Sequence, residues 1–486
     1  MFNSVLKDIL VIIFLFCGTI LLSQDCSISV QGRVLDKVSQ LPLSYVNVYL
    51  QETSQGAATG NDGRFFFNDV CAGHYHIIFS HIGCEDTKLY IELERDTVIN
   101  IDLDHSDHSF GVLVIKDQKD NLSTQPNLSV NRKKIEDSSN QNLSGLIENE
   151  VGIHLIKNGS GISKPVVQGL YGNRLTILNN GIAQSGQQWG YDHGPEIDPF
   201  AADNITILKG ASALEYNGGN MGSVILVEPK RITREPHLHG QVNYSYESNG
   251  RGNNANFRLE KYSRKIAWRI NGTLRKYGDR KTTNYYLNNT GLQEANFSIQ
   301  LEKEWNEKIF VDFYASSFNT RLGVLRGSHV TLPEQIEQAF TLLEPFYTEP
   351  NFSYGIDAPK QHVSHQLIKL KAKYYQNETS VLEFIIAGQL NDRKEFDIRR
   401  SGRSDIPALS LKQYTVNVDF TYAKVLGDNW NFKIGNQAIV TDNTNNPTGI
   451  LPLIPDYLSW ENGIFATISK KINVLQFKSG IRYDFE

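Results

Sequence analysis

The sequence lacks the features that mark several common protein classes. It has no basic excess, since 48 Lys and Arg residues stand against 53 Asp and Glu residues, so nothing favours a nucleic-acid partner. Its mean hydropathy of −0.35 is too low for a polytopic helical membrane protein. The apolar fraction of 40% and the charged fraction of 21% exclude a largely disordered chain.

Methionine and cysteine are scarce, whereas aromatic residues are abundant. The chain has 2 Met and 4 Cys, but 22 Tyr and 24 Phe, and Tyr and Phe favour β-strands. The sequence has no phosphate-binding loop, no nucleophile elbow and no paired metalloprotease histidines. We therefore expect a mainly β protein that is not an enzyme and has no cofactor. A length of 486 residues suggests several domains.

The N-terminus predicts export. Residues Ile9 to Leu22 form an apolar stretch of 14 residues, whereas a membrane-spanning helix needs about 20. Residues 1–23 are therefore expected to be a signal peptide, and the alternative is an uncleaved anchor. Export would leave Cys26, Cys71 and Cys84 in an oxidising compartment, where one disulfide is expected without the sequence indicating which pair forms it.

Residues 26–104 contain short strand-like runs separated by turn signals, which predict a small antiparallel β-sandwich. Three segments carry a resemblance: Gly32-Arg33-Val34, Leu43 to Val48, and Thr59 to Phe65. They resemble the carboxypeptidase-regulatory-like, transthyretin-type domain. That domain often precedes outer-membrane receptors of Bacteroidetes-type bacteria and has no catalytic role.

Residues 105–125 are mostly polar and are predicted to be a linker. A short apolar run with strong β propensity interrupts them, and it includes Gly111, Val112, Leu113, Val114 and Ile115. An isolated strand of this kind can add to the edge of another protein's sheet. Its position before the next domain resembles that of the TonB box of TonB-dependent receptors, which implies TonB as a partner. The alternative is an internal strand of the following domain.

Residues 126–228 combine a short amphipathic helix, expected to end near Val151-Gly152, with glycine-rich turns and short strands. The blocks Pro165 to Leu170, Asn173 to Gly181, Ile205 to Gly210 and Gly218 to Val227 resemble the plug of TonB-dependent outer-membrane transporters. The match is spread over about a hundred residues. Ala211 and Ser223 depart from the residues usual in the family, but the turn chemistry remains.

One plug loop, Gln187 to Pro199, contains aromatic rings, a histidine and three carboxylates. Imidazole with carboxylate suits a transition metal, and an Asp-His pair here resembles a feature of some metal-importing family members. The alternative is that Asp192 and His193 only hold the plug in the barrel wall. The candidate substrate contacts are Arg174, Trp189, Tyr191, Asp192 and His193, although Arg174 is also expected to make structural pairs.

Residues 237–486 alternate between apolar and polar side chains. Tyr and Trp edge the apolar side and the polar side is rich in charge, as expected for a lipid-facing band around a wet lumen. About eleven strands of about ten residues are connected by alternating short and long loops, which predicts an antiparallel transmembrane β-barrel. Plugged transporters use about 22 strands, so we expect only about half of the barrel strands here, and hence a fragment or a truncated chain.

The resemblance implies TonB-dependent active transport of a ligand across the outer membrane of a Gram-negative bacterium. The expected partners are the TonB energy-transducing complex, outer-membrane lipid and a small ligand. We expect that ligand to be a metal ion or a siderophore-like metal chelate. Candidate metal ligands are Asp192, His193, His362 and His365, of which the last two could chelate together only if their segment is a loop. The alternatives are import of a glycan or peptide, or a non-transporting signalling receptor or adhesin.

Overall fold

A computed structural model describes most of the chain. The described residues are 26–36, 40–53, 55–81, 87–103, 128–159, 161–186, 193–216, 223–234, 237–263, 266–306, 308–329, 332–399, 402–427, 430–447, 449, 454–472 and 475–486. The expected signal peptide, the linker and the candidate TonB box lie outside them. The chain divides into two compact units, Met1–Gly111 and Val112–Glu486, which are described separately.

The first unit is a β-sandwich. Its described strands are β1 (Ile28–Asp36), β2 (Asn47–Leu50), β3 (Gly56–Ala58), β4 (Arg64–Val70), β5 (Gly73–Ser80), β6 (Thr87–Leu93) and β7 (Thr97–Leu103). One sheet has the order β4-β1-β7 and the other β3-β2-β5-β6. Alternating apolar residues such as Val30, Val48, Phe67 and Phe79 form one buried core between them.

One strand pair of this sandwich departs from the expected antiparallel pattern. β7 pairs with β1 in parallel over seven residues, from Val30–Thr97 to Asp36–Leu103. The chain leaves the first sheet after β4, forms β5 and β6 in the second sheet, and returns as β7. Such a crossover provides the long connection that a parallel pair requires.

A disulfide joins Cys26 and Cys71 at one end of the sandwich. The sequence predicted one bridge without identifying the pair, and the fold identifies it by placing Cys26, two residues before β1, beside Cys71, the residue after β4. Cys84 lies outside the described residues.

The second unit begins with the plug. Its described elements are β8 (Leu128–Asn131), α2 (Arg132–Asp137), α3 (Leu143–Ile147), β9 (Ile153–Asn158), β10 (Ile162–Val167), η1 (Gly172–Arg174), β11 (Thr176–Asn179), β12 (Ile182–Ala183), η2 (Pro199–Ala201), β13 (Asn204–Lys209), η3 (Gly210–Glu215) and β14 (Ser223–Glu228). A mixed sheet has the order β12-β11-β14-β13-β8, and β9 and β10 form a separate hairpin. An apolar core that includes Ile135, Leu146 and Ile205 packs the helices against this sheet.

The plug has two short helices where one was predicted. Ser138 ends α2, and the side chain of Asn142 then accepts a hydrogen bond from the Gly145 backbone N–H at 2.9 Å. Asparagine is a strong N-cap residue, so a new helix begins at this position. The apolar spacing was continuous in the sequence because both helices bury their residues in the same core.

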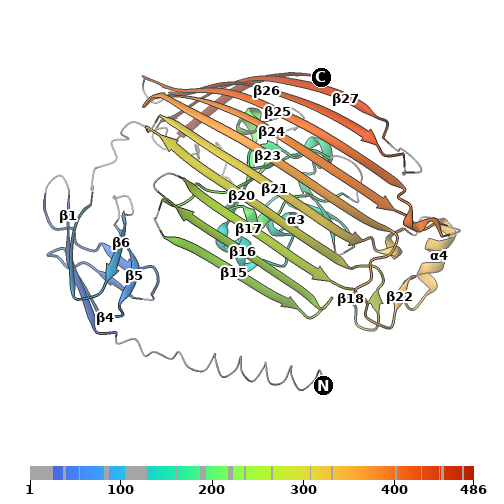
Figure 1. Cartoon of the computed structure of the whole chain (residues 1–486), viewed down its shortest axis with the longest axis horizontal. Helices are drawn as coiled ribbons and strands as arrows, with labels where there is room; N and C mark the ends of the chain where they lie inside the picture. Colours follow the sequence, from blue (N-terminus) through green and yellow to red (C-terminus); the bar gives the residue numbers. More distant parts are fainter. Residues whose placement is uncertain are drawn as a thin grey trace. The chain divides into compact units, whose positions relative to one another are not determined.

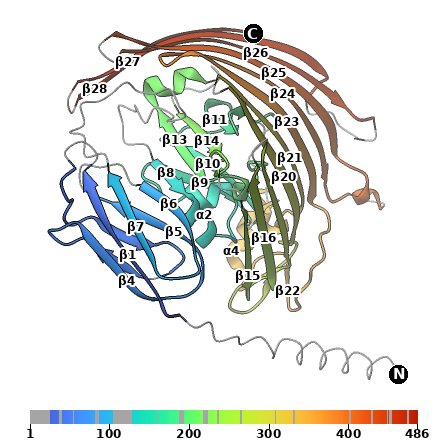
Figure 2. The ribbon, with the colours of Figure 1, turned by 60° about the vertical axis from the view of Figure 1, so that its left-hand side comes forward.

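The large sheet of this unit has eleven strands, connected strictly in sequence order (Figure 1). They are β15 (Leu238–Glu247), β16 (Gly252–Tyr262), β17 (Ala267–Tyr277), β20 (Leu292–Trp305), β21 (Ile309–Gly323), β23 (Lys360–Asn377), β24 (Ser380–Phe396), β25 (Leu409–Leu426), β26 (Trp430–Asn445), β27 (Tyr457–Ile472) and β28 (Leu475–Phe485). Every pair of neighbouring strands in this sheet is antiparallel, as expected. The sheet curves around the plug (Figure 2).

The two faces of this sheet have opposite chemistry. On β23, Ile368 and Leu370 of the outward face are 58% and 42% exposed, whereas the inward Lys369 between them is 1% exposed. Charges buried inside and apolar residues exposed outside are the reverse of a water-soluble sandwich and are the pattern of a barrel wall in lipid. No helix among the described residues is long and apolar enough to cross a bilayer.

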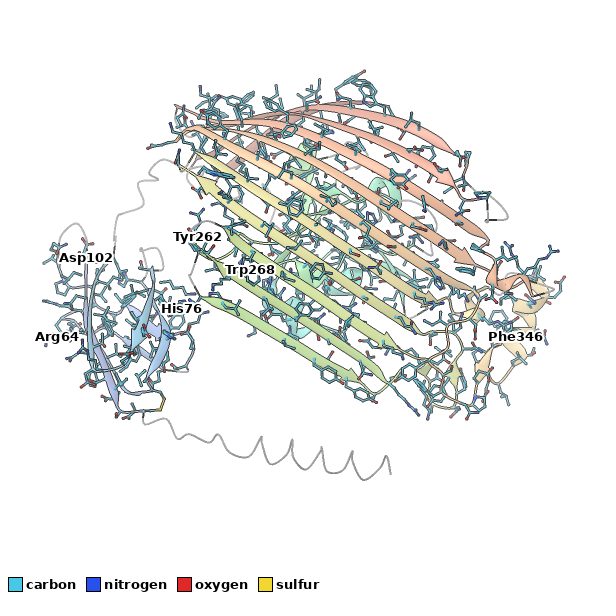
Figure 3. The ribbon with its side chains drawn as sticks, in the orientation of Figure 1. Arg64, His76, Asp102, Tyr262, Trp268 and Phe346 are labelled. Atoms are coloured by element: carbon cyan, nitrogen blue, oxygen red, sulfur yellow. A yellow bond between two sulfur atoms is a disulfide. The ribbon has the colours of Figure 1, made fainter. Side chains whose placement is uncertain are left out.

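The strand connections sort by length, as predicted. One end of the sheet has short turns, and Tyr262 and Trp268 lie near this end (Figure 3). The other end carries long segments that contain β18 (Arg280–Lys281), β19 (Tyr286–Leu287), η4 (Arg326–His329), α4 (Pro333–Thr341), β22 (Thr348–Glu349) and η5 (Arg403–Asp405). The prediction of ten-residue strands was too short, since β23 and β25 have 18 residues each and continue towards the long loops.

Candidate functional site

The plug is joined to the inner face of the sheet by buried charged groups, and Glu196 lies at the centre of the largest set. Its carboxylate is 4% exposed and accepts hydrogen bonds from Arg393 and Asn391 of β24. The imidazole Nδ1 of His365 on β23 lies 2.8 Å from Glu196 Oε2. Burial alone would raise the pKa of Glu196, but Arg393 and His365 outweigh burial and lower it. Glu196 is therefore a charged anchor between plug and wall.

His193 makes a second contact of this kind three residues earlier in the chain. Its Nε2 lies 2.7 Å from Glu395 Oε1 on β24, and its side chain is 7% exposed. Arg393 Nη1 lies 3.3 Å from the same carboxylate oxygen, so Arg393 links Glu395 to Glu196. The loop before η2 is thus attached to β24 through one continuous set of charges.

The start of the same loop is held by amide groups. Gln389 Nε2 of β24 donates to the Ala183 carbonyl at 2.9 Å, and the Ser185 N–H donates back to Gln389 Oε1 at 3.3 Å. Gly186 follows with φ of +75°, and a Cβ at that position would lie 2.9 Å from Asn391 Nδ2. Only glycine allows both this backbone conformation and this close approach to the wall.

Two further ion pairs anchor other parts of the plug. Asp203 lies just before β13. Its carboxylate accepts hydrogen bonds from both terminal nitrogens of Arg258 on β16, at 2.7 and 2.9 Å. Glu215, at the end of η3, lies 2.6 Å from Lys433 Nζ and 2.7 Å from Lys478 Nζ. Burial would raise the pKa of Glu215, but the two ammonium groups outweigh burial and lower it to about 2.

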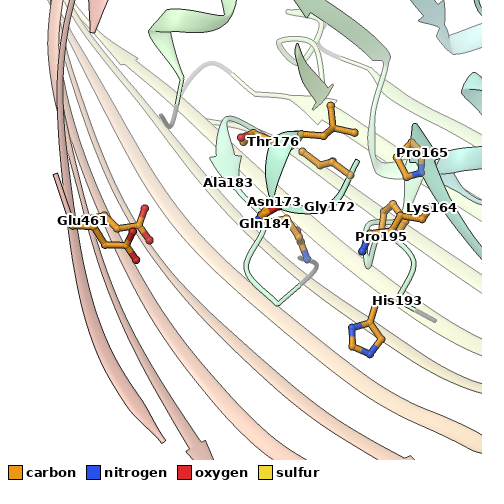
Figure 4. Close-up of a pocket in the computed structure, with 13 residues that line it drawn as sticks. Lys164, Pro165, Gly172, Asn173, Thr176, Ala183, Gln184, His193, Pro195 and Glu461 are labelled. Carbon is orange, nitrogen blue, oxygen red and sulfur yellow. The ribbon is translucent and has the colours of Figure 1, made fainter. Parts of the chain in front are cut away.

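A cavity of about 390 Å³ opens between the plug and β27 (Figure 4). Polar groups from both sides line it, namely Lys164, Asn173, Thr176, Gln184, His193 and Glu461. Such a size and such a set of donors and acceptors suit a small polar ligand. The cavity adjoins the loop that carries His193, so a ligand in it would lie beside the anchors described above.

Two family models match the chain. Residues 30–115 match the model described as CarboxypepD_reg-like domain. Residues 120–224 match the model described as TonB-dependent Receptor Plug Domain.

Residues 120–224 are a TonB-dependent receptor plug domain.

Solved structures of similar fold include the siderophore receptor PirA from Pseudomonas aeruginosa, with 14% identity and a TM-score of 0.52. The copper transporter OprC has 15% identity and a TM-score of 0.56. The ferric-catecholate import receptor Fiu from E. coli K12 has 14% identity and a TM-score of 0.55. Each match covers 74% of this chain and 55–60% of the other chain, so this chain spans little more than half of their length.

The site residues predicted from the sequence differ in their surroundings. Gly111–Ile115, Trp189, Tyr191 and Asp192 lie outside the described residues. Arg174 lies in η1 with an exposed side chain, and it makes no ion pair with any described carboxylate. Its expected pairing with plug or wall is therefore not seen within this part of the chain.

For His193 the sequence left two alternatives, binding of substrate or metal and attachment of the plug to the barrel wall. In the structure His193 makes a hydrogen bond to the wall, at Glu395. Its burial and its bond to Glu395 position the ring beside the cavity.

His362 and His365 do not meet the condition set for a shared metal site. Both lie within strand β23, where residues three apart point to opposite faces. His365 points inward to Glu196, whereas His362 faces outward and lies 2.8 Å from Arg321 Nε. Among the residues that the structure describes, no group of three or more His, Cys, Asp or Glu side chains could hold a metal ion.

No motif in the sequence identified Glu196, Arg393 or Glu395 as site residues. A usable signal was present, because both wall residues are charges at inward positions of an alternating strand. A charge on the inner face needs a partner of opposite sign when it is buried. The partner could not be identified from sequence, since Glu196 and Arg393 are 197 residues apart.

Proposed function

We propose that this chain belongs to a receptor that imports a metal chelate across the outer membrane by a TonB-dependent mechanism. The observation that carries the proposal is a plug held by buried ion pairs inside a sheet whose outward face is apolar. A wall of this kind separates two aqueous compartments, and the plug fills its lumen. Import then requires the plug to change its contacts with the wall.

The polar plug contacts suit a reversible movement. Beside apolar contacts such as that of Ile182 with Leu367, they include hydrogen bonds and ion pairs such as Asp203–Arg258. Water can replace the partner of each charged group once the plug moves. The charged groups would otherwise be costly to leave unpaired. β8 is an edge strand of the plug sheet, and it pairs with β13 over only four residues. A force applied through residues 111–115 would reach this short edge strand first.

A chelated metal fits the site better than a bare ion. His365 is already bonded to Glu196, and His193 to Glu395. A chelate brings its own metal ligands and needs only hydrogen-bond partners, which the cavity provides at Asn173 and Thr176. The similar structures named as a siderophore receptor and a ferric-catecholate import receptor support this class of cargo. Arg174, Trp189, Tyr191 and Asp192 remain our proposed contacts.

Scrambling Val112–Ile115 in the chromosomal gene tests the proposal. Uptake of ⁵⁵Fe, supplied to iron-limited cells as a catecholate chelate, should fall to the level of a strain lacking the gene. Permuting the adjacent segment 116–120 is the matched control and should leave uptake unchanged. Both variants must be present in the outer membrane in equal amounts.

Three results would contradict the proposal. Uptake that survives the scramble removes TonB coupling through this segment. Receptor-dependent uptake of a labelled oligosaccharide or peptide in place of the chelate replaces the cargo. Receptor-dependent signalling without any uptake removes transport altogether.

A further inference from the structure

A second hollow lies on the receptor at the long-loop end of β15 to β17. Its volume is about 310 Å³, and none of the described residues that line it carries a carboxylate. The lining residues are Ser248, Asn249, Gly250, Arg251, Lys281, Thr282, Tyr286 and Phe352. The hollow therefore combines two cations with two aromatic rings and several small polar groups.

The cations in and beside the hollow rest on aromatic rings. The Arg251 guanidinium lies 4.2 Å from the ring centre of Phe352, and Lys281 Nζ lies 5.6 Å from that of Tyr286. Lys276 Nζ lies 5.0 Å from the ring of Tyr354. These three cations are exposed, and none forms an ion pair with a carboxylate of the described part of the chain. Their positive charge is thus available to an anion.

Two nearby carboxylates are already bonded to other groups. Glu349, which lies opposite Tyr286 in strand register, accepts a hydrogen bond from Asn288 Nδ2 at 3.2 Å and offsets part of the positive charge. Glu247, the carboxylate that precedes the β15–β16 turn, is paired with Arg280.

The Tyr354 hydroxyl donates a hydrogen bond to the Arg251 carbonyl at 2.7 Å. Tyr354, over which Lys276 lies, is thereby connected to the residues that line the hollow. Arg251, Lys276 and Lys281 therefore form one connected group, which we call the rim cations.

The rim cations begin where the apolar outward face ends. In strand register, Leu274, Ala255 and Tyr244 form one outward row. The next outward row towards the long loops is Lys276, Asn253 and Tyr246. Tyrosines at the boundary between apolar and charged rows mark the edge of a lipid bilayer.

The same change occurs on other strands. On β24 the outward residues pass from Leu390 through Asp392 to Lys394, and on β25 from Tyr414 to Lys412. Asp392 lies 4.0 Å from both lysines and offsets part of their charge. The outward face at the long-loop end therefore carries cations on several strands, and the rim cations differ from Lys394 and Lys412 in having no described carboxylate within ion-pair distance.

We propose that the rim cations and their hollow bind the phosphate groups of a phosphorylated glycolipid of the outer leaflet, of the lipid A type. Phosphate is the anion that paired guanidinium and ammonium groups recognise well, and basic groups at a membrane surface attract anionic head groups. The site faces outward, beside the apolar rows that acyl chains would cover, whereas cargo would pass on the inner side. The inference rests on the membrane placement in the proposed function but not on the cargo.

Lipid binding by the full chain in detergent tests the inference. The probe is bisphosphorylated lipid A, titrated and counted by native mass spectrometry, with phosphate-free lipid A in parallel. The variant is R251N/K276Q/K281Q, in which Asn suits the φ of +44° at position 251. We expect its affinity for lipid A to fall about 10- to 100-fold, and the parent to bind phosphate-free lipid A weakly.

A matched variant, K303Q/K424Q/K470Q, removes three outward lysines at the short-turn end. Two of them also lie over aromatic rings, Lys303 over Trp305 and Lys470 over Trp430. Its affinity for lipid A should equal that of the parent. Equal loss in both variants, or equal binding of phosphate-free lipid A, would overturn the inference.

Two further measurements separate the remaining outcomes. Displacement of lipid A by millimolar inorganic phosphate would make the hollow a soluble-anion site and would overturn the lipid assignment. If the triple variant unfolds at a lower temperature than the parent, Lys276→Gln alone is used, and an unchanged affinity in it contradicts the proposal. Chelate uptake that stays normal while lipid binding is lost shows that the two functions are independent.

Discussion

Asp203 of the plug and Arg258 of β16 form a two-point ion pair in which each carboxylate oxygen faces its own guanidinium nitrogen, at 2.7 and 2.9 Å. Arg269 of β17 lies 3.5 Å from Asp203 as a second cation. Both side chains of the pair are only 10% exposed. Burial makes the loss of one partner more costly than the loss of both.

The stability losses caused by removing Asp203 and by removing Arg258 should therefore not add up in the double variant. We expect Arg258→Met or Asp203→Asn to lower the free energy of unfolding by about 3 kcal/mol, because each removes the two-point partner of a buried charged group. The double variant should lose less than the sum of the two. Urea unfolding of the full chain in detergent micelles measures this, with the exposed outward Lys424→Met as control. Additive losses would contradict a direct coupling.

Acid should release the η3 anchor at Glu215. Its pKa is lowered from 4.5 to about 2 in the folded chain, so its pairing stabilises the fold fully above pH 4.5. That contribution, up to about 3 kcal/mol, is lost as the pH falls from about 4.5 towards 2. Glu215→Gln should flatten the dependence of stability on pH in this window. Unchanged acid sensitivity in this variant would show that other groups are responsible.

His193 and Glu395 should act as a unit if the histidine holds the plug to the wall. We expect His193→Ala and Glu395→Ala to alter chelate uptake alike, each weakening plug docking by about 2 kcal/mol. The measurement is ⁵⁵Fe uptake at several chelate concentrations. A raised half-saturating concentration in His193→Ala alone would instead indicate direct contact with the cargo. Uptake equal to the parent in His193→Ala would remove the metal role of this residue.

The Cys26–Cys71 bridge should stabilise the N-terminal sandwich. It closes a loop with a sequence separation of 45 residues, which predicts a loss of about 4 kcal/mol when it is removed. Limited proteolysis of the full chain, with Cys71→Ser compared with Cys84→Ser, measures the effect. Faster cleavage within residues 26–103 is expected for Cys71→Ser only. Equal rates in the two variants would show that the sandwich does not depend on the bridge.

Local patterns in the sequence determined the class of the fold. Alternation in segments such as Lys369 to Tyr374 has a period of two, and it identifies both the strand and its two faces without any knowledge of neighbours. Loop lengths predicted the barrel wall in the same way, whereas the plug was predicted from the resemblance of several glycine-rich blocks to the plug of TonB-dependent transporters. The prediction of one short plug helix was wrong because capping by Asn142 is a local event that apolar spacing does not reveal.

Tertiary structure alone decided which residues meet. Strand register placed His365 inward against Glu196 and His362 outward, so two histidines three residues apart have unrelated roles. The same packing joined Glu196 to Arg393, Asp203 to Arg258, and Cys26 to Cys71. Sequence records the chemistry of each side chain and the period of each strand, but partners far apart in the chain are selected only when plug and wall pack together.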